Sequence, residues 1–379
     1  MKIALKELGE IITGNTPSKK NDEFYSSRDI AFVKPDIISD KFITEMNEVD
    51  EYISENARSK ARIVSKGAIL VTCIGSIGKI GIISDGEYAF NQQINAIIPI
   101  EANQKYLAYN LLYNKSRLID IANAPVVPII NKTQFGDFEI LYCSDKKIQQ
   151  DIVYQLDCIM SVIDKRQKQL KYLDELVKAR FVEMFGDPCV NPKNYPIKKF
   201  PDIAEYWNGL TYKPEDVSCN GTVVLRSSNI QNSALDFKDT VRVNCEINAK
   251  KFVKNNDILM CSRNGSARLV GKVALIKNID EPMSFGAFMM IIRSDYYPYL
   301  MTYFQMPAFR SQITTGATTT INQITGKMLD IIKIPVPDMD TVNKFAEFVQ
   351  QVDKSKSAIK KSLEETQILF DSLMQKYFG

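Results

Sequence analysis

The chain contains the stretch KKIQQDIVYQLDCIMSVIDKRQKQLKYLDELVKARFVEMFG, residues 146–186, whose apolar residues recur on two interleaved seven-residue ladders. Alternating steps of three and four residues place both ladders on one narrow face of an α-helix, the pattern by which helices pair in a coiled coil. The stretch therefore predicts one long helix with an apolar face, here called the seam. Its predicted seam residues are Ile152, Leu156, Ile159, Ile163, Leu170, Leu173 and Val177.

The final part of the chain, residues 340–379, repeats this pattern. The two stretches also end alike, in EMFG at 183–186 and KYFG at 376–379. A shared period and a shared ending predict that the two helices partner each other, in antiparallel orientation. The second set of predicted seam residues is Phe345, Val349, Val352, Ile359, Leu363, Phe370 and Leu373.

Three charged residues interrupt the seam, namely Arg166, Arg180 and Lys356. A charge that is buried without a partner is costly, so each must reach solvent or pair across the interface. Polar seam residues can also fix the register and orientation of a helix pair. We therefore expect these three side chains to find partners and to control register.

The two regions outside the helices resemble each other. KGAILVTCIGSIGKIGII at 66–83 corresponds to NNDILMCSRNGSARLVGKVALI at 255–276, with four extra residues in the turn. Helical spacing at 106–121 recurs at 299–313, and the pair Ile130-Asn131 recurs as Ile321-Asn322. The chain therefore reads as a tandem duplication.

The predicted class is α+β, with two similar globules, each built on a curved sheet with helices. Strands are expected at 30–33, 68–73, 79–84 and 95–100, where apolar runs end at turn-forming residues. The domain plan is a first globule at 1–145, a helical spacer at 146–186, a second globule at 187–339 and a second spacer at 340–379. Antiparallel pairing of the helices would relate the halves by a pseudo-twofold axis.

Composition excludes several classes of protein. There is no histidine, which removes the commonest general base and every histidine metal site. The seven cysteines form no CxxC pair, so neither a zinc site nor a disulfide framework is indicated. No apolar run approaches the ~18 residues of a membrane span, and the N-terminus has no secretory segment, so we expect a cytoplasmic protein.

A set of motifs occurs in a characteristic order. GNTPS at 14–18 comes first, then KGAILVTCIGSIGK, NQQINAI at 91–97, IIN at 129–131 and KKIQQDIV at the helix start; RFVEMFGDP at 180–188 ends the first helix. In this order the chain resembles the specificity subunits (HsdS) of type I restriction-modification systems, and the resemblance covers essentially its whole length.

The resemblance implies a non-catalytic, DNA-binding subunit. Two target recognition domains would each read one half of a bipartite site, and the helices would form a fixed coiled-coil spacer. The implied partners are double-stranded DNA, two methyltransferase (M) subunits and the restriction-translocase (R) subunits. S-adenosylmethionine, ATP and Mg²⁺ would bind those partners, so this chain itself is expected to hold no cofactor, no metal and no membrane contact.

Two other classes stay open. A solitary DNA-binding regulator would be expected to carry more positive charge, whereas residues 187–339, the most basic region, hold 18 basic against 14 acidic side chains. A metal-dependent nuclease would rest on Pro201-Asp202 and Asp236-Phe-Lys238. The adenine methyltransferase loop is not found, since Asn191–Tyr195 lacks its second proline, and neither is a P-loop, since Ile80 and Val273 stand where Ser or Thr is needed.

Candidate DNA contacts are residues that suit base edges or phosphates: Arg and Lys for guanine, Asn and Gln for adenine, Ser and Thr for phosphate. In the first globule these are Thr16, Ser18, Lys19, Lys20, Lys34, Lys79, Asn91 and Gln92. In the second they are Thr211, Tyr212, Lys213, Arg226, Ser228, Asn229, Arg263, Asn264, Ser266, Arg268 and Lys272, with Thr318–Thr320 a further possibility. No catalytic residue is predicted.

Overall fold

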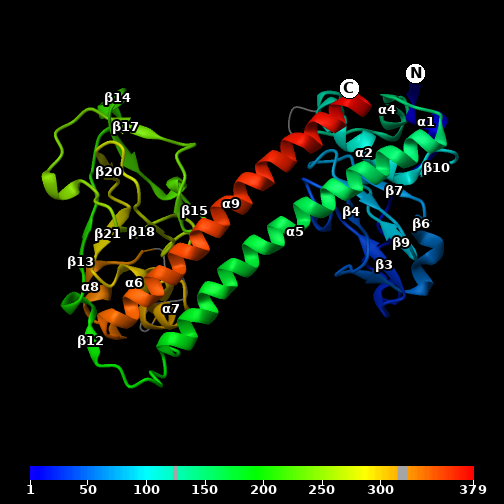
Figure 1. Ribbon diagram of the computed structural model, residues 1–379. Helices are drawn as coiled ribbons and strands as arrows, with labels where there is room; N and C mark the ends of the chain where they lie inside the picture. The colour runs from blue at the N-terminus through cyan, green and yellow to red at the C-terminus, as the bar shows by residue number, and fades with distance from the viewer. Residues whose placement is uncertain (123–126, 315–322) are drawn as a thin grey trace. The chain divides into compact units, whose positions relative to one another are not determined.

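The computed structural model describes residues 1–122, 127–314 and 323–379, which form two compact units. Unit 1 comprises Met1–Gln167 and Lys361–Gly379, and unit 2 comprises Lys168–Lys360. The border therefore falls inside both long helices, α5 (Lys146–Phe185) and α9 (Met339–Phe378) (Figure 1). This differs from the predicted plan of separate globules and spacers, because each globule shares its core with the nearer halves of both helices. The predicted pair Ile321-Asn322 and Thr318–Thr320 lie outside the described residues.

Unit 1 is built on two sheets. Its elements before α5 are β1 (Lys2–Ala4), α1 (Leu5–Leu8), β2 (Gly9–Thr13), β3 (Ile30–Val33), β4 (Thr44–Glu45), β5 (Tyr52–Ile53), β6 (Ile63–Ser65), β7 (Ile69–Thr72), β8 (Ile80–Ile82), β9 (Glu87–Phe90), β10 (Ile94–Pro99), α2 (Gln104–Tyr113), α3 (Lys115–Asp120), α4 (Lys132–Gly136) and β11 (Glu139–Leu141). One sheet has the order β2-β10-β7-β8-β4 and the other β5-β3-β9-β6, while β1 pairs with β11. The predicted α+β class is confirmed, and the strands of this globule divide between two main sheets.

Unit 2 repeats this plan. Its elements between the helices are β12 (Ile197–Lys199), β13 (Glu205–Asn208), β14 (Val217–Leu225), β15 (Ile230–Gln231), β16 (Ala234–Leu235), β17 (Val241–Val243), β18 (Ile258–Cys261), β19 (Val273–Leu275), β20 (Met283–Phe285), β21 (Met289–Arg293), α6 (Tyr297–Tyr303), α7 (Pro307–Thr314), α8 (Gly326–Asp330) and β22 (Lys333–Pro335). The order β13-β21-β18-β19 matches β2-β10-β7-β8, and the parallel pair β14–β20 matches β3–β9. The internal repeat is confirmed.

The central strand of each main sheet is buried on both faces. Side chains alternate between faces along a strand, so Ile69 and Val71 of β7 enter the core that also contains α5 and α9, whereas Leu70 enters the core beneath β3 and β9. In β18, Met260 and Leu259 divide in the same way. Each main sheet therefore lies between a helical layer and a second sheet.

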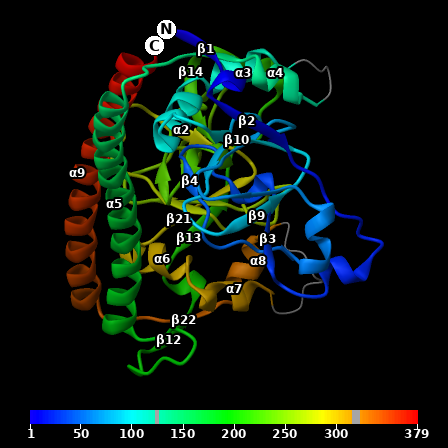
Figure 2. The same ribbon diagram turned by 90° about the vertical axis from the view of Figure 1, so that its right-hand side faces the viewer.

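The two helices run antiparallel within each unit. In unit 1, Gln155 accepts a hydrogen bond from Tyr377 (2.6 Å), whereas Arg166, further along α5, reaches Ser362, which comes earlier in α9. Figures 1 and 2 show these two segments side by side. In unit 2, Asp174 pairs with Lys356. All predicted seam residues are buried or half-buried.

The charged seam residues have partners, as expected. Arg166 Nη1 donates to the carbonyl of Ser362 (2.6 Å) and to the hydroxyl of Thr366. Lys356 Nζ forms an ion pair with Asp174 Oδ1 across the helices (2.5 Å). Arg180 pairs along its own helix with Glu183 (2.8 Å) and lies over the ring of Phe348.

Replacing Arg166 with alanine should lower the free energy of unfolding by about 1–3 kcal/mol, because hydrogen bonds from a charged, half-buried group are lost. The exposed neighbour Lys165 is a matched control, since Lys165→Ala should change stability by less than ~0.5 kcal/mol. Denaturant unfolding followed by circular dichroism measures both variants. Equal midpoints for the two variants would contradict a structural role of Arg166.

Within residues 1–122, 127–314 and 323–379, no helix combines the length and apolar character that crossing a membrane requires.

Candidate functional site

The candidate residues gather at one edge of the main sheet in each unit. Neighbouring strands in an antiparallel sheet run in opposite directions. The loop that follows one strand and the loop that precedes its neighbour therefore lie at the same edge of the sheet. In unit 1 these loops follow β2, join β7 to β8, and join β9 to β10. In unit 2 they follow β13, join β18 to β19, and join β20 to β21. We call this set of loops, with the residues after β3 and after β14, the loop edge.

Matching backbone hydrogen bonds hold the two loop edges. The four bonds of unit 1 run from Gly14 N to Ile94 O, Asn91 N to Val33 O, Cys73 N to Gln93 O, and Ile130 N to Cys73 O. Their counterparts run from Gly209 N to Met289 O, Gly286 N to Leu225 O, Ser262 N to Phe288 O, and Ile324 N to Ser262 O. The counterpart of Ile130 is therefore Ile324, and not Ile321 as the sequence suggested. The two units thus share the backbone conformation of these loops, whereas the loop side chains differ between the units.

One glycine in each unit allows the loops to approach closely. A Cβ atom at Gly14 would lie 2.2 Å from the carbonyl oxygen of Asn91, and one at Gly209 would lie 2.1 Å from that of Phe285. No other residue fits at such distances, because backbone rather than a flexible side chain would have to move. GNTPS and Asn208-Gly209 therefore mark equivalent turns.

In unit 1 most candidates reach the surface. Ser18, Lys19, Lys20 and Gln92 are exposed, and Thr16, Lys34 and Lys79 are half-buried. Thr16 donates to the side-chain oxygen of Gln92 (2.8 Å), which brings the first loop and the β9–β10 loop together. Lys79 donates to the carbonyl of Pro35 (3.0 Å), and Lys34 pairs with Glu51.

Asn91 serves the loop itself. Its side chain is 6% exposed, accepts from the backbone N–H of Gln93 (3.1 Å) and donates to the Gln93 side chain (2.8 Å). With its donor and acceptor both occupied and solvent excluded, Asn91 shapes the turn that presents Gln92. The structure therefore assigns it to positioning, where the sequence suggested contact.

In unit 2 the candidates occupy equivalent loops. Thr211, Lys213, Arg263, Ser266 and Arg268 are exposed, while Tyr212, Arg226, Ser228, Asn264 and Lys272 are half-buried. Asn264 donates to the hydroxyl of Ser227 (3.2 Å) and accepts from the backbone N–H of Ser266 (2.9 Å), which links the β18–β19 loop to the segment after β14. Lys213 pairs with Glu215 at 3.1 Å, fully at the surface.

Two further candidates of unit 2 are engaged internally. Asn229 is 1% exposed; it accepts from Arg226 N (2.8 Å) and donates to the carbonyls of Asp236 and Asp239. Arg226 Nη2 donates to both carboxylate oxygens of Asp239, at 2.8 Å each. Asn229 is thus a loop residue like Asn91, and Arg226 is partly neutralised.

Five of the candidate basic side chains have no hydrogen-bond or ion-pair partner within the described ranges. They are Lys19, Lys20, Arg263, Arg268 and Lys272, of which Arg263 lies over the ring of Phe288. Lysine and arginine in exposed loops without a local carboxylate present uncompensated positive charge. They are therefore the residues best placed to meet an anion such as phosphate.

Sequence reasoning missed Phe288. It lies in the β20–β21 loop, 59% of it is exposed, and Arg263 Cζ lies 5.4 Å from its ring centroid. The available signal was the alignment of this loop with Asn91–Gln93, which places Phe288 at the position of Gln93.

The described residues of the loop edge do not form a catalytic arrangement. Burial raises the pKa of the Cys73 thiol to about 12 and also raises that of Cys261, so neither is a thiolate at neutral pH. Asp202 and Asp236, the nuclease candidates, each accept from a backbone N–H of their own turn, at Lys199 and Lys238. No group of three or more potential metal-ligating residues occurs in the part of the chain that the structure describes.

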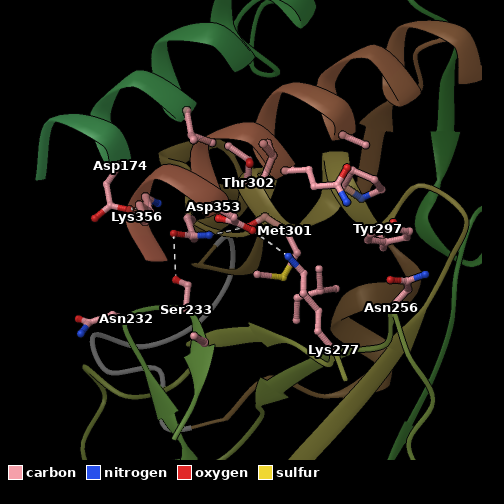
Figure 3. A pocket seen from close by; sticks show the side chains of 18 of the residues that line it. Asp174, Asn232, Ser233, Asn256, Lys277, Tyr297, Met301, Thr302, Asp353 and Lys356 are labelled. Carbon is pink, nitrogen blue, oxygen red and sulfur yellow. Dashed lines mark hydrogen bonds and ion pairs between the residues drawn. The ribbon is translucent and has the colours of Figure 1, made fainter. Parts of the chain in front are cut away.

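A separate hollow of about 1040 Å³ lies in unit 2, between the β15–β16 hairpin, α6 and the helices. Figure 3 shows Lys277 reaching Asp353 (2.8 Å) and Lys356 directed toward Asp174. These two ion pairs neutralise much of the charge on the side chains that line the hollow.

Comparison with known proteins decides the family. A profile described as the type I restriction modification DNA specificity domain matches the chain twice, over residues 1–172 and 192–368. The chain belongs to this family. The two matches coincide with the duplication, so each unit carries one copy of the specificity domain. Unit 1 also holds the start of α5 and the end of α9, and unit 2 holds the end of α5 and the start of α9.

Individual relatives agree. The HindI specificity subunit of Haemophilus influenzae is 32% identical over 182 residues, which covers 45% of this chain and 39% of that protein. The MjaIX specificity subunit of Methanocaldococcus jannaschii is 27% identical, covering 54% of this chain and 51% of the relative. The matches thus span about two-fifths to one half of the length of these curated relatives.

Solved structures share the fold. The S subunit of the type I restriction-modification system of M. genitalium aligns with a TM-score of 0.56 at 16% identity, covering 100% of this chain and 96% of that one. A chain from a study of complex assembly and conformational transition in a type I system gives 0.59 at 15% identity, with 100% and 97% covered.

Proposed function

We propose that this chain is the DNA sequence-specificity subunit of a type I restriction-modification complex, in which each unit reads one half of a bipartite site. The observation that carries the proposal is the loop edge, built twice on the same backbone frame with different side chains. The shared loop backbone places the two DNA-reading surfaces at equivalent positions in the two units. Their different side chains give the two surfaces different base preferences. A two-part, non-palindromic target follows.

The loop edges supply the chemistry that DNA reading needs. Exposed Lys19, Lys20 and Arg268 suit phosphates, which fix the position of a protein on the duplex but carry no sequence information. Gln92 suits the N6 and N7 edge of adenine, and Arg263 suits the O6 and N7 edge of guanine. Base selection is accordingly assigned to the turns at Gln92 and Arg263.

The chain is proposed to act without catalysis of its own. Two methyltransferase subunits and the restriction-translocase subunits are the proposed partners, and S-adenosylmethionine, ATP and Mg²⁺ are assigned to them. Membership of the specificity family supports this division of labour. The proposed compartment is the cytoplasm, where the bacterial or archaeal chromosome lies.

Replacing Arg268 with alanine should weaken binding to all duplexes alike and reduce the slope of log affinity against log salt by about 1, because one phosphate contact is lost. Lys198→Ala on β12 is the control, since Lys198 is exposed outside the loop edge. Fluorescence anisotropy over a salt series measures both. An unchanged slope for Arg268→Ala would remove this residue from the interface.

The proposal as a whole is tested by binding of the chain, assembled with its methyltransferase subunits, to a duplex carrying the bipartite site and to a scrambled duplex. A specificity subunit should favour the intact site by roughly a thousandfold or more. Tight, specific binding by the isolated chain would instead favour the solitary regulator, and metal-dependent cleavage by the isolated chain would favour the nuclease.

A further inference from the structure

Phe288 is placed as a rigid, exposed aromatic at the centre of the unit 2 loop edge. Its carbonyl accepts hydrogen bonds from the backbone N–H groups of Ser262 and Arg263 and from the Ser262 hydroxyl, at 2.9 to 3.0 Å. Three bonds to one carbonyl fix the backbone from which the ring projects. The exposed ring of Phe288 contributes little to the free energy of folding, because most of its surface stays in water.

The neighbours of Phe288 determine which groups its ring can contact. The guanidinium of Arg263 lies over one face of the ring, so that face is already covered. Full insertion between two base pairs needs both faces of a ring, and is therefore disfavoured here. The free face and the ring edge remain for an apolar group presented at the surface of a DNA groove.

Among base edges, thymine alone presents a methyl group in the major groove, and it packs against apolar side chains such as phenylalanine. Arginine beside it is suited to a guanine edge. The corresponding loop of unit 1 carries Gln92, exposed, and Gln93, hydrogen-bonded to Asn91, so the two units offer different chemistry at one position of the frame.

We propose that Phe288 is a specificity-determining residue that contacts a thymine methyl group in the half-site read by unit 2, with Arg263 stacked on it as a second reading group. This inference rests on the proposed function and goes beyond it by assigning a base and a residue. It also predicts that the half-site of unit 2 contains at least one thymine.

Thymine-to-uracil substitution tests the contact, because it removes only the methyl group and preserves base pairing. The chain assembled with its methyltransferase subunits is titrated with duplexes in which each thymine of that half-site is replaced in turn. One replacement should weaken binding by wild-type complex about fourfold, the value of one buried methyl group. Phe288→Ala should weaken binding to the thymine duplex by roughly tenfold and be insensitive to that uracil.

Two further variants serve as a control and as a conservative replacement. Ile331, 70% exposed and adjacent to β22 rather than to the loop edge, is the control, and Ile331→Ala should bind as wild type does. Phe288→Leu keeps an apolar group and should retain part of the uracil sensitivity. Since Phe288 is exposed, Phe288→Ala should unfold at the wild-type temperature, which separates a reading defect from misfolding.

The outcomes distinguish this inference from the function on which it rests. Wild-type affinity for Phe288→Ala, no sensitive thymine, or a half-site without thymine would overturn the assignment of Phe288 while the specificity role stands. If the wild-type complex fails to distinguish the bipartite duplex from a scrambled one, both the proposed function and the inference fall.

Discussion

Gly209→Ala should weaken recognition of one half of the DNA site while leaving the rest of the protein folded. The added Cβ would lie 2.1 Å from the carbonyl oxygen of Phe285 and 2.3 Å from that of Gly286, so the turn after β13 and the β20–β21 loop must separate. Loss of a base contact costs about 1–3 kcal/mol. We therefore expect affinity for the specific duplex to fall by roughly tenfold to a hundredfold. Anisotropy with the assembled methyltransferase complex measures it.

A matched control lies outside the loop edge. Gly326 begins α8, and a Cβ atom there would meet only Tyr206 Cε2, at an ordinary contact distance of 3.7 Å. Gly326→Ala should therefore bind as wild type does. Gly14→Ala, the equivalent of Gly209→Ala in unit 1, should instead damage the other half-site. If Gly209→Ala and Gly326→Ala behaved alike, the close approach of the loops would have no bearing on recognition.

Phe345→Ala should destabilise unit 2 by about 3–5 kcal/mol, as expected for removing a fully buried aromatic side chain. Phe345 on α9 is 0% exposed and packs edge-on against Phe181 and Phe185 of α5, at ring-centroid distances of 5.7 and 5.2 Å. Both of these rings also contact Tyr299 of α6. The cluster therefore joins the helix pair to the globule, and its loss weakens both contacts together.

Differential scanning calorimetry would show the effect as a lower transition temperature for unit 2. Phe237→Ala serves as the control, because Phe237 is 51% exposed and loses little packing on truncation. The two substitutions remove the same atoms, so burial alone accounts for the expected difference. Equal shifts would mean that the aromatic cluster does not hold the helices to the sheet.

The long-range plan was predictable because it depends on periodicity. The seam residues, the antiparallel pairing and the duplication all follow from spacing along the chain, and strand β3 occupies the predicted residues 30–33. Helices were harder to delimit: the predicted helix at 106–121 is broken at Asn114 into α2 and α3. A cap at an asparagine interrupts a helix without changing its apolar spacing.

The site was predictable only in part. Loop positions could be found from the matching turns, so Lys19, Gln92 and Arg268 lie where expected. Asn91 and Asn229 have the chemistry of base readers but are buried, because an amide that satisfies a turn is the same residue type as one that reads adenine. Phe288 was missed since phenylalanine normally marks a core, and only the structure shows its exposure.

The domain borders were not predictable from pattern alone. The seven-residue spacing continues on both sides of residues 167 and 168, where the compact units divide. What sets the border is the set of side chains beside the seam, such as Phe378 in unit 1, which contact the globules rather than the other helix. Their spacing is too irregular to stand out in the sequence.

The central claim, that this chain selects the DNA sequence for a methyltransferase, is tested most directly by single-molecule methylome sequencing. DNA is compared from cells with the gene intact, with the gene deleted, and with Gly209→Ala in its place, the methyltransferase gene being present throughout. We predict that N6-methyladenine at one bipartite motif disappears in the deletion and is lost or relaxed at one half of that motif in the variant. Methylation that stays unchanged at every motif in the deletion strain would contradict the account.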